Sequence, residues 1–426
     1  MLNSYSDFSV YARHTGVQIA DADGYFVGLV AGGYQTGVAQ SFTSTRVEFG
    51  KDPIAALERT GDLTLDANSF NQNQSFTTAG GGGYYAGSAA ESVMDAGDYG
   101  SGKYSAAVLV DDWSSGYRVL PVDAGGVYIS AASETEFFAG TDSTTVSVVG
   151  GSGATSKTEV DTNVRVDLGK NVSFSAMQVD IDAFNSAYQI QNPYFSGFSS
   201  SVYGAGGGAA NGSAGLSYQN LKNLTAEVIL GKNGVLKISD LAWLDSTYDH
   251  NITIDANTDF YVYDESKLEI GGALQGAGAE SDVDVKTRNK ITVGEGYNIY
   301  NPVGEIGIGT YSRGSAVAQA NVSVWAAAGV AGGVSDVYLD VLNQVNIGKN
   351  AIINSYGDVG IYSGRASNYF QENQLTSNAL ANVYNWTAIP IPAGNKAKSN
   401  ISLTNKVEFA DGFAVGSDSH VFIEAK

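Results

Sequence analysis

Short alternating apolar tracts recur along this chain at intervals of roughly sixty residues, a period typical of repeat architectures. The first kind of tract has the form Val-x-apolar-Gly-Lys-Asn. It occurs at 47–51, 166–171, 228–233, 291–294 and 345–350, with a shortened copy at 407–410. Its glycines at 169, 231, 294 and 348 are 62, 63 and 54 residues apart, while Gly50 precedes Gly169 by 119 residues. A weak copy at 108–111 falls inside that double interval.

A second kind of tract supports the same period independently. Two apolar residues separated by one position follow a turn-forming residue in eight places. The pairs are Phe8/Val10, Leu63/Leu65, Val127/Ile129, Val179/Ile181, Ile252/Ile254, Ile306/Ile308, Val359/Ile361 and Val421/Ile423. Most of them follow the first tract by a similar short distance, so the two signals are largely in phase.

Alternation over only a few positions, interrupted by Gly, Asn or Asp, predicts short strands joined by tight turns. The turn positions predicted to be structurally important are Gly50, Gly169, Asn171, Gly231, Asn233, Gly294, Gly348 and Asn350. We expect the glycines to supply positive φ angles, and the asparagines to tolerate the left-handed conformation better than other residues do.

The stretch 289–311 holds three such strands in about twenty residues, which is the length of one three-sided coil of a parallel β-helix. The sequence therefore predicts an all-β fold, a right-handed parallel β-helix (β-solenoid), in which each degenerate repeat of about sixty residues covers about three coils. Right-handedness follows from the crossover rule. At the strand spacing, twenty-odd coils would form a rod on the order of 100 Å long.

Residues 1–426 are predicted to form a single continuous solenoid. Ala/Gly-rich stretches at 80–90, 204–215, 271–279, 316–333 and 379–396 are interpreted as coils with small residues inside, and 188–198 as a surface excursion. A β-sandwich array is the competing fold, but four tryptophans at unrelated repeat positions do not supply one core anchor per domain. Neither end resembles a polar cap, so we expect a segment of a longer chain or a stacked subunit.

Composition narrows the classes of function. A formal charge of −21 with only 16% charged residues disfavours nucleic-acid binding, which requires a basic stripe. The hydrophobic fraction of 43% is too high for a disordered chain. The sequence contains no run of eighteen apolar residues, so no transmembrane segment is predicted. The absence of cysteine is unremarkable for a bacterial exported protein.

No catalytic motif stands out. His14, His250 and His420 are far apart in the sequence, so we expect no common metal site. Asp111 and Asp112 are weak candidates for Ca²⁺, which needs several oxygen ligands, although solvated carboxylates are the favoured interpretation. Mixed Asp, Lys and Arg at 284–289 and 396–405 are the only mild candidates for a polysaccharide-active site on a β-helix.

The tract 345–351, followed by Gly357-Asp358-Val359-Gly360-Ile361 and by Ala/Gly-rich spacers, resembles the repeat regions of bacterial filamentous haemagglutinin-like and leukotoxin-type filamentous adhesins. The resemblance covers nearly the whole chain and rests on the repeat pattern. It implies a right-handed β-helix that is exported to the cell surface.

These observations predict a non-enzymatic, extracellular structural or adhesive protein, the β-helical shaft of a cell-surface filamentous adhesin. The alternative is a subunit of a self-assembling extracellular filament or sheath, joined end to end by strand stacking. A β-helix polysaccharide-active enzyme is the less favoured alternative. Expected partners are neighbouring copies or flanking segments, and host or cell-surface glycans and proteins. No cofactor is expected apart from the candidate Ca²⁺.

Overall fold

The computed structural model describes residues 7–50, 61–97, 104–113, 122–190, 201–239, 247–368, 370–391 and 393–426. These residues form strands that pair in parallel in one continuous sheet, an all-β arrangement consistent with a β-helix. The prediction of an all-β fold with parallel strands is confirmed. The described residues include no helix, and therefore none long and apolar enough to cross a membrane.

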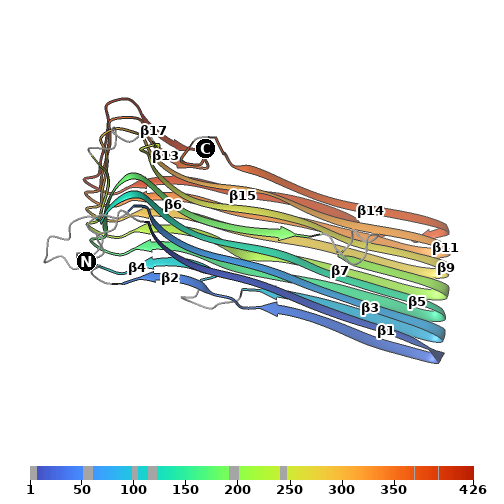
Figure 1. The fold of residues 1–426 in the computed structure, drawn as a ribbon. Helices are drawn as coiled ribbons and strands as arrows, with labels where there is room; N and C mark the ends of the chain where they lie inside the picture. The colour runs from blue at the N-terminus through green and yellow to red at the C-terminus, as the bar shows by residue number, and fades with distance from the viewer. Residues whose placement is uncertain are drawn as a thin grey trace.

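The chain forms successive layers, each of which pairs with the layers before and after it. The strands, in order, are β1 (Phe8–Ser41), β2 (Thr45–Phe49), β3 (Leu63–Ala96), β4 (Ala106–Val110), β5 (Val122–Leu168), β6 (Ser173–Gln189), β7 (Val202–Leu230), β8 (Val235–Ile238), β9 (Ile252–Val293), β10 (Asn298–Asn301), β11 (Ile306–Ile347), β12 (Ile352–Ser355), β13 (Val359–Ser363), β14 (Gln374–Ile391), β15 (Asn395–Phe409), β16 (Ala414–Ser417) and β17 (Val421–Ala425). Figure 1 shows the layers following one another from the N-terminus to the C-terminus.

One sequence repeat forms one layer. Ile252 pairs with Ile306, and Ile306 with Val359, so that neighbours in the sheet are about one repeat apart in sequence. The prediction of about three coils per repeat is therefore wrong, and so is the expectation of twenty-odd coils. Seven layers and the start of an eighth span roughly 35 Å at the strand spacing, instead of the predicted 100 Å.

The register aligns the copies of both tracts in columns. All eight copies of the second tract lie in one column: Phe8, Leu63, Val127, Val179, Ile252, Ile306, Val359 and Val421. The first tract forms another column, which includes its weak copy: Val47, Val108, Val166, Val228, Ile291, Val345 and Val407. Both columns contribute buried side chains to the same hydrophobic cluster.

Each layer has a compact head and a long pair of arms. In the head, the two tract columns and a third column of short strands surround the largest hydrophobic cluster; the third column contains Phe174, Leu236, Ile299, Ile353 and Val415. Beyond the head, the long strands extend together to one side of the molecule and turn back (Figure 1). We call the first half of each excursion the outgoing arm and the second half the return arm.

The two arms of a layer face each other across a narrow interior. The Ser156 hydroxyl donates a hydrogen bond to the carbonyl of Ala139 at 2.8 Å, and the Ser335 hydroxyl donates to the carbonyl of Ala318 at 2.8 Å. Apolar clusters fill the interior of the later layers, where Ala316, Ala318 and Ala320 are fully buried, as the Ala/Gly-rich spacers predicted. In the earlier layers, near the point where the arms turn back, hydroxyl side chains fill the interior in place of apolar ones. The hydroxyl oxygens of Ser88 and Ser143, for example, are 2.9 Å apart.

Glycine permits the reversal at the tip of the arms. Gly208 and Gly272 have φ angles of 147° and 154°, and a Cβ at Gly272 would lie 1.7 Å from the carbonyl oxygen of Gly208 in the adjacent layer. The predicted surface excursion at 188–198 falls mostly outside the described residues.

A buried asparagine ladder joins three layers where the return arm meets the head. The Asn289 amide donates to Asn343 Oδ1 at 3.0 Å, and the Asn343 amide donates to Asn405 Oδ1 at 2.9 Å. Asn343 also donates to Asn373 Oδ1 at 3.0 Å and accepts from the Ser312 hydroxyl at 3.1 Å. Because Asn343 is fully buried, its neighbours depend on it for their hydrogen bonds.

We predict that Asn343→Ala lowers the free energy of unfolding by about 2–3 kcal/mol, because it leaves buried amide groups on either side unsatisfied. Asn378→Ala, at an exposed position of β14, is the control and should change stability by less than about 0.5 kcal/mol. Urea unfolding followed by circular dichroism measures both. Equal effects of the two substitutions would contradict a structural role for the ladder.

Candidate functional site

The predicted turn residues meet in columns at one corner of the head. Asn171, Asn233 and Asn350 have φ angles of 60°, 57° and 55°, in the left-handed region that the sequence predicted for them. In two other layers the same position holds Gly296 and Gly412, with φ angles of 65° and 73°. The backbone N–H groups of Asn171, Asn233, Gly296 and Asn350 each donate to a carbonyl of the next layer, as between Asn171 and Lys232 at 2.8 Å.

The glycines of this corner act through close approach of the backbone. None of Gly50, Gly169, Gly231, Gly294 and Gly348 has a positive φ, so the expectation that these glycines supply that conformation is wrong. A Cβ at Gly231 would lie 2.4 Å from the carbonyl of Gly169, and a Cβ at Gly294 would lie 2.5 Å from the carbonyl oxygen of Gly231. Gly50 differs, because nothing lies within 4 Å of the Cβ position there.

The candidate calcium ligands Asp111 and Asp112 lie beside this corner. Asp112 accepts a hydrogen bond from the backbone N–H of Lys170 at 2.8 Å and forms a 2.9 Å ion pair with the Lys170 ammonium. Lys232 and Glu295 form an equivalent pair at 3.0 Å. Among the described residues, no group of three or more His, Cys, Asp or Glu could hold a metal ion. Asp112 is thus engaged in an interlayer ion pair.

The other chemical candidates lie apart from one another. His14 lies in the first layer, and His250 lies just before β9. His420 lies just before β17, with its Nδ1 3.2 Å from Asp358 Oδ1. In the segment 284–289, Arg288 forms an ion pair with Asp340 of the next layer and also donates to its backbone carbonyl at 3.0 Å. Lys396 pairs with Asp336 at 2.8 Å. These contacts link adjacent layers and do not converge on a common site.

Sequence reasoning missed a loop that crosses the outside of the head. This clasp, the described residues 364–368 and 370–373 after β13, lies directly on Gly307 and Gly309 of β11. A Cβ at Gly309 would lie 2.3 Å from the backbone nitrogen of Ser367. The clasp therefore needs two outward glycines in β11, where the layer beneath has Thr253 and Asp255. Those two glycines in an otherwise regular tract were the available signal.

The clasp contacts a carboxylate two layers away. Ser367 donates to Asp255 through its backbone N–H, at 2.9 Å, and through its hydroxyl. Asp182 pairs with Asp255 in register on the next strand. Burial raises the pKa of Asp255 to about 6, although the hydrogen bonds from Ser367 lower it. Burial, together with the charges of Asp255 and Asp180, raises the pKa of Asp182 to about 8.

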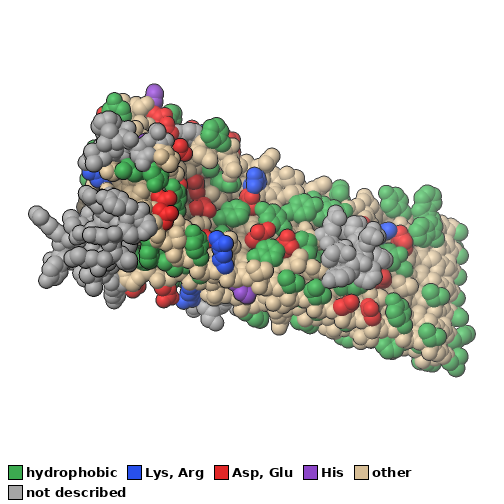
Figure 2. All heavy atoms as spheres, viewed as in Figure 1, with side chains coloured by type: hydrophobic (Ala, Val, Ile, Leu, Met, Phe, Trp, Pro, Cys, Tyr) green, Lys and Arg blue, Asp and Glu red, His purple; other side chains and the backbone are tan. Residues whose placement is uncertain are grey.

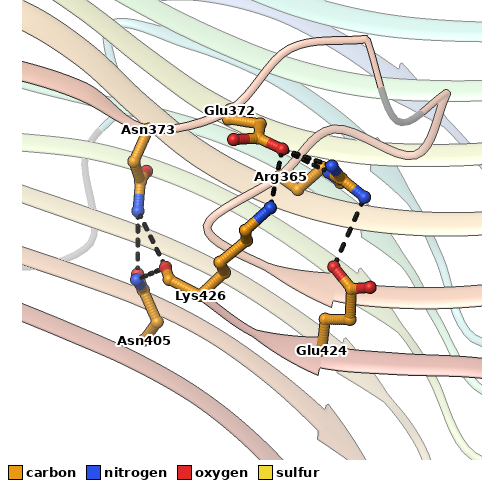
Figure 3. A network of polar contacts seen from close by, with 6 residues as sticks. All are labelled: Arg365, Glu372, Asn373, Asn405, Glu424 and Lys426. Atoms are coloured by element: carbon orange, nitrogen blue, oxygen red, sulfur yellow. Dashed lines mark hydrogen bonds and ion pairs between the residues drawn. The ribbon is translucent and has the colours of Figure 1, made fainter.

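Ion pairs fasten the far side of the clasp to the last layer, as Figure 3 shows. Arg365 pairs with Glu372 within the clasp and with Glu424 of β17 at 3.3 Å. Lys426 pairs with the same Glu372 at 3.0 Å. Asn373 of the clasp donates to Asn405 Oδ1 at 3.1 Å, which joins the asparagine ladder to the clasp, and the Asn405 amide donates to the carbonyl oxygen of Lys426. The clasp thus ties several layers together on one outer face.

The chain was also compared with known proteins. No family model, curated protein or solved structure matches it.

We predict that Gly231→Ala destabilises the fold by about 1–3 kcal/mol, because the new methyl group would overlap backbone atoms of the adjacent layer. Gly50→Ala, in the same column but with open space at the Cβ position, should change the free energy of unfolding by less than about 0.5 kcal/mol. Thermal and urea unfolding of both variants test this difference. Equal losses in the two variants would show that interlayer contact is not the reason for glycine at this corner.

The raised pKa values predict that stability falls as the pH rises. The carboxyl of Asp182 binds its proton more tightly in the folded chain than in the unfolded chain, so ionisation between about pH 4 and pH 8 favours unfolding. Asp182→Asn should raise the free energy of unfolding at pH 8 by about 1–2 kcal/mol, after a discount for partial solvent screening. At pH 5 the substitution should have little effect. A gain of the same size at both pH values would contradict this assignment.

Proposed function

We propose that this chain is a segment of the β-helical shaft of a cell-surface filamentous adhesin, with a structural and adhesive function and no enzymatic one. The layered stack is then a right-handed β-solenoid whose length grows with the number of repeats. The resemblance of the repeat tracts to filamentous haemagglutinin-like and leukotoxin-type adhesins supports an extracellular, cell-surface location and a bacterial source. The in-register parallel stacking of every repeat on the next is the observation that carries the proposal.

The last layer leaves uncovered the apolar side chains whose counterparts are buried in the layers before it. Val359 and Ile361 are fully buried in an inner layer, whereas Val421 and Ile423, their partners in the last layer, are 43% and 46% exposed. Likewise, Leu339 is fully buried and its partner Ile401 is 47% exposed. A further layer of the same kind would cover these side chains and pair with the open backbone edge.

The same end surfaces favour a second candidate function, a subunit of a self-assembling extracellular filament or sheath. Here the covering layer would come from another copy, which joins end to end by strand pairing. The two candidates differ in whether neighbouring layers belong to the same polypeptide. Both make the repeats themselves the functional element, with flanking segments, neighbouring copies and host or cell-surface molecules as partners.

Electron microscopy of the purified chain at several concentrations distinguishes the two candidates. For the shaft segment we expect discrete particles, about 35 Å along the stacking axis. For the self-assembling subunit we expect fibres of uniform width. Ile401→Lys, which places a charge on the open end of the interior, should then suppress fibre growth. Ser402→Lys, one residue away on the outer face, is the control and should leave it unchanged.

Immunogold labelling of intact cells of the source organism tests the proposed location. We expect label on the cell surface or on structures that project from it, because an adhesin shaft must reach its partner outside the cell. Label confined to the interior of sectioned cells would contradict both candidate functions.

A further inference from the structure

The distal part of the return arms presents a face without charges, in a chain whose formal net charge is −21. Three adjacent columns of side chains form this return-arm face. The tip column holds Val30, Tyr85, Val149, Ala210, Leu274, Ala328 and Ile389. The middle column holds Gly32, Gly87, Gly151, Gly212, Gly276, Val330 and Ile391, and the third holds Tyr34, Ala89, Gly153, Ala214, Gly278 and Gly332.

All the residues of the return-arm face are at least partly exposed. The first charged side chains of the return arms, among them Glu91, Lys157, Glu280 and Asp336, lie in the next two columns toward the head. On the side of the molecule that Figure 2 shows, charged side chains become sparse toward the far end of the arms.

Three of the five glycines in the middle column, Gly32, Gly87 and Gly212, have no internal reason to be glycine, whereas a Cβ at Gly151 would lie 3.0 Å from the carbonyl oxygen of Gly212. None of the five glycines has a positive φ. A Cβ at Gly32, Gly87 or Gly212 would meet only the carbonyl oxygen of the next glycine, at 3.7–3.9 Å, which is an ordinary contact. Glycine within a strand costs stability, and where the fold does not require it, it often marks a place where another backbone approaches closely.

We propose that the return-arm face is the contact between two copies of this chain, which pack side by side, face to face. The columns cover roughly 17 Å by 34 Å, or on the order of 600 Å², from the residue and strand spacings. That area approaches the 800 Å² or so per partner of a stable interface and exceeds what a crystal contact buries. An identical copy supplies a matching face that is uncharged and has few side chains, so a symmetric pair can form.

Charge also favours this face as the site of self-association. Two copies that each carry a net charge of −21 repel each other at long range, and the repulsion is weakest where both surfaces are uncharged. Small residues let two backbone surfaces approach closely. Van der Waals packing between the backbones then stabilises the pair at positions that have no large side chain to bury. A lipid surface would gain apolar burial mainly from the tip column and from Val330 and Ile391, because the rest of the face, apart from Tyr34, is Gly and Ala. A glycan would find no polar side chains other than two tyrosine hydroxyls.

Analytical ultracentrifugation of the full chain tests the proposal. The variant Ile401→Lys serves as the background, so that end-to-end stacking does not contribute. We expect a species of twice the 44.4 kDa chain mass to appear as the concentration rises. Raising the salt from about 20 mM to about 500 mM should strengthen the pairing, because screening reduces the repulsion between the copies.

Gly212→Glu places a carboxylate at the centre of the face and should weaken pairing by roughly 100-fold, because like charges then oppose each other. The matched control is Gly207→Glu, in the same layer on the outgoing arm. There the only atom near the Cβ position is a carbonyl oxygen 4.0 Å away, and pairing should be unchanged. Circular dichroism should show that both variants are folded.

Three outcomes would overturn the proposal. The first is a chain that stays monomeric at all concentrations and salt levels. The second is equal weakening by Gly207→Glu and Gly212→Glu. The third is a monomeric chain that binds phosphatidylcholine vesicles and loses this binding in Gly212→Glu, which would assign the face to lipid.

Discussion

The parallel backbone ladder between successive repeats is the interaction on which the rest of this structure depends. The arms of a layer face each other through side chains, so the backbone N–H and C=O groups of the long strands find their partners in the layers above and below. β9 and β11 pair in register along nearly their whole length of 42 residues each. A layer alone could not satisfy these groups, and stability therefore comes from stacking.

The ladder also explains why the chain is repetitive in some columns and variable in others. In the head, each inward residue lies on its counterpart in the next layer, so Ile252, Ile306 and Val359 keep the same apolar character. At the head corner the backbones are so close that Gly169, Gly231 and Gly294 leave no room for a side chain. On the outer faces the side chains are not confined by the next layer, so their type can vary. Ion pairs, the clasp and the uncharged return-arm face all occur there.

The sequence predicted the head well and the arms poorly, for physical reasons. Both tracts were found because strong alternation and turn residues coincide there, and the weak copy at Val108 lies in the expected column. The coil length was wrong because the three short strands in 289–311 were taken as one complete coil and the Ala/Gly-rich stretches as further coils. Gly80–Gly82 and Gly204–Gly207 instead lie within the long strands of single layers, which the neighbouring layers hold in place. Gly307 and Gly309 were the only signal for the clasp, and its contact could not be predicted from them, because it joins Ser367 to Asp255, residues 112 positions apart.

Pairwise spin labelling tests most directly the central claim, that one repeat forms one layer. The chain has no cysteine, so introduced pairs label cleanly. Lys267→Cys with Asn321→Cys joins residues that pair in register on β9 and β11, about 4.8 Å apart along the stack, and should give strong dipolar broadening. Lys267→Cys with Lys286→Cys joins opposite arms of one layer and should give little broadening. Broadening in the second pair but not in the first would support coils of about twenty residues and contradict the structure described here.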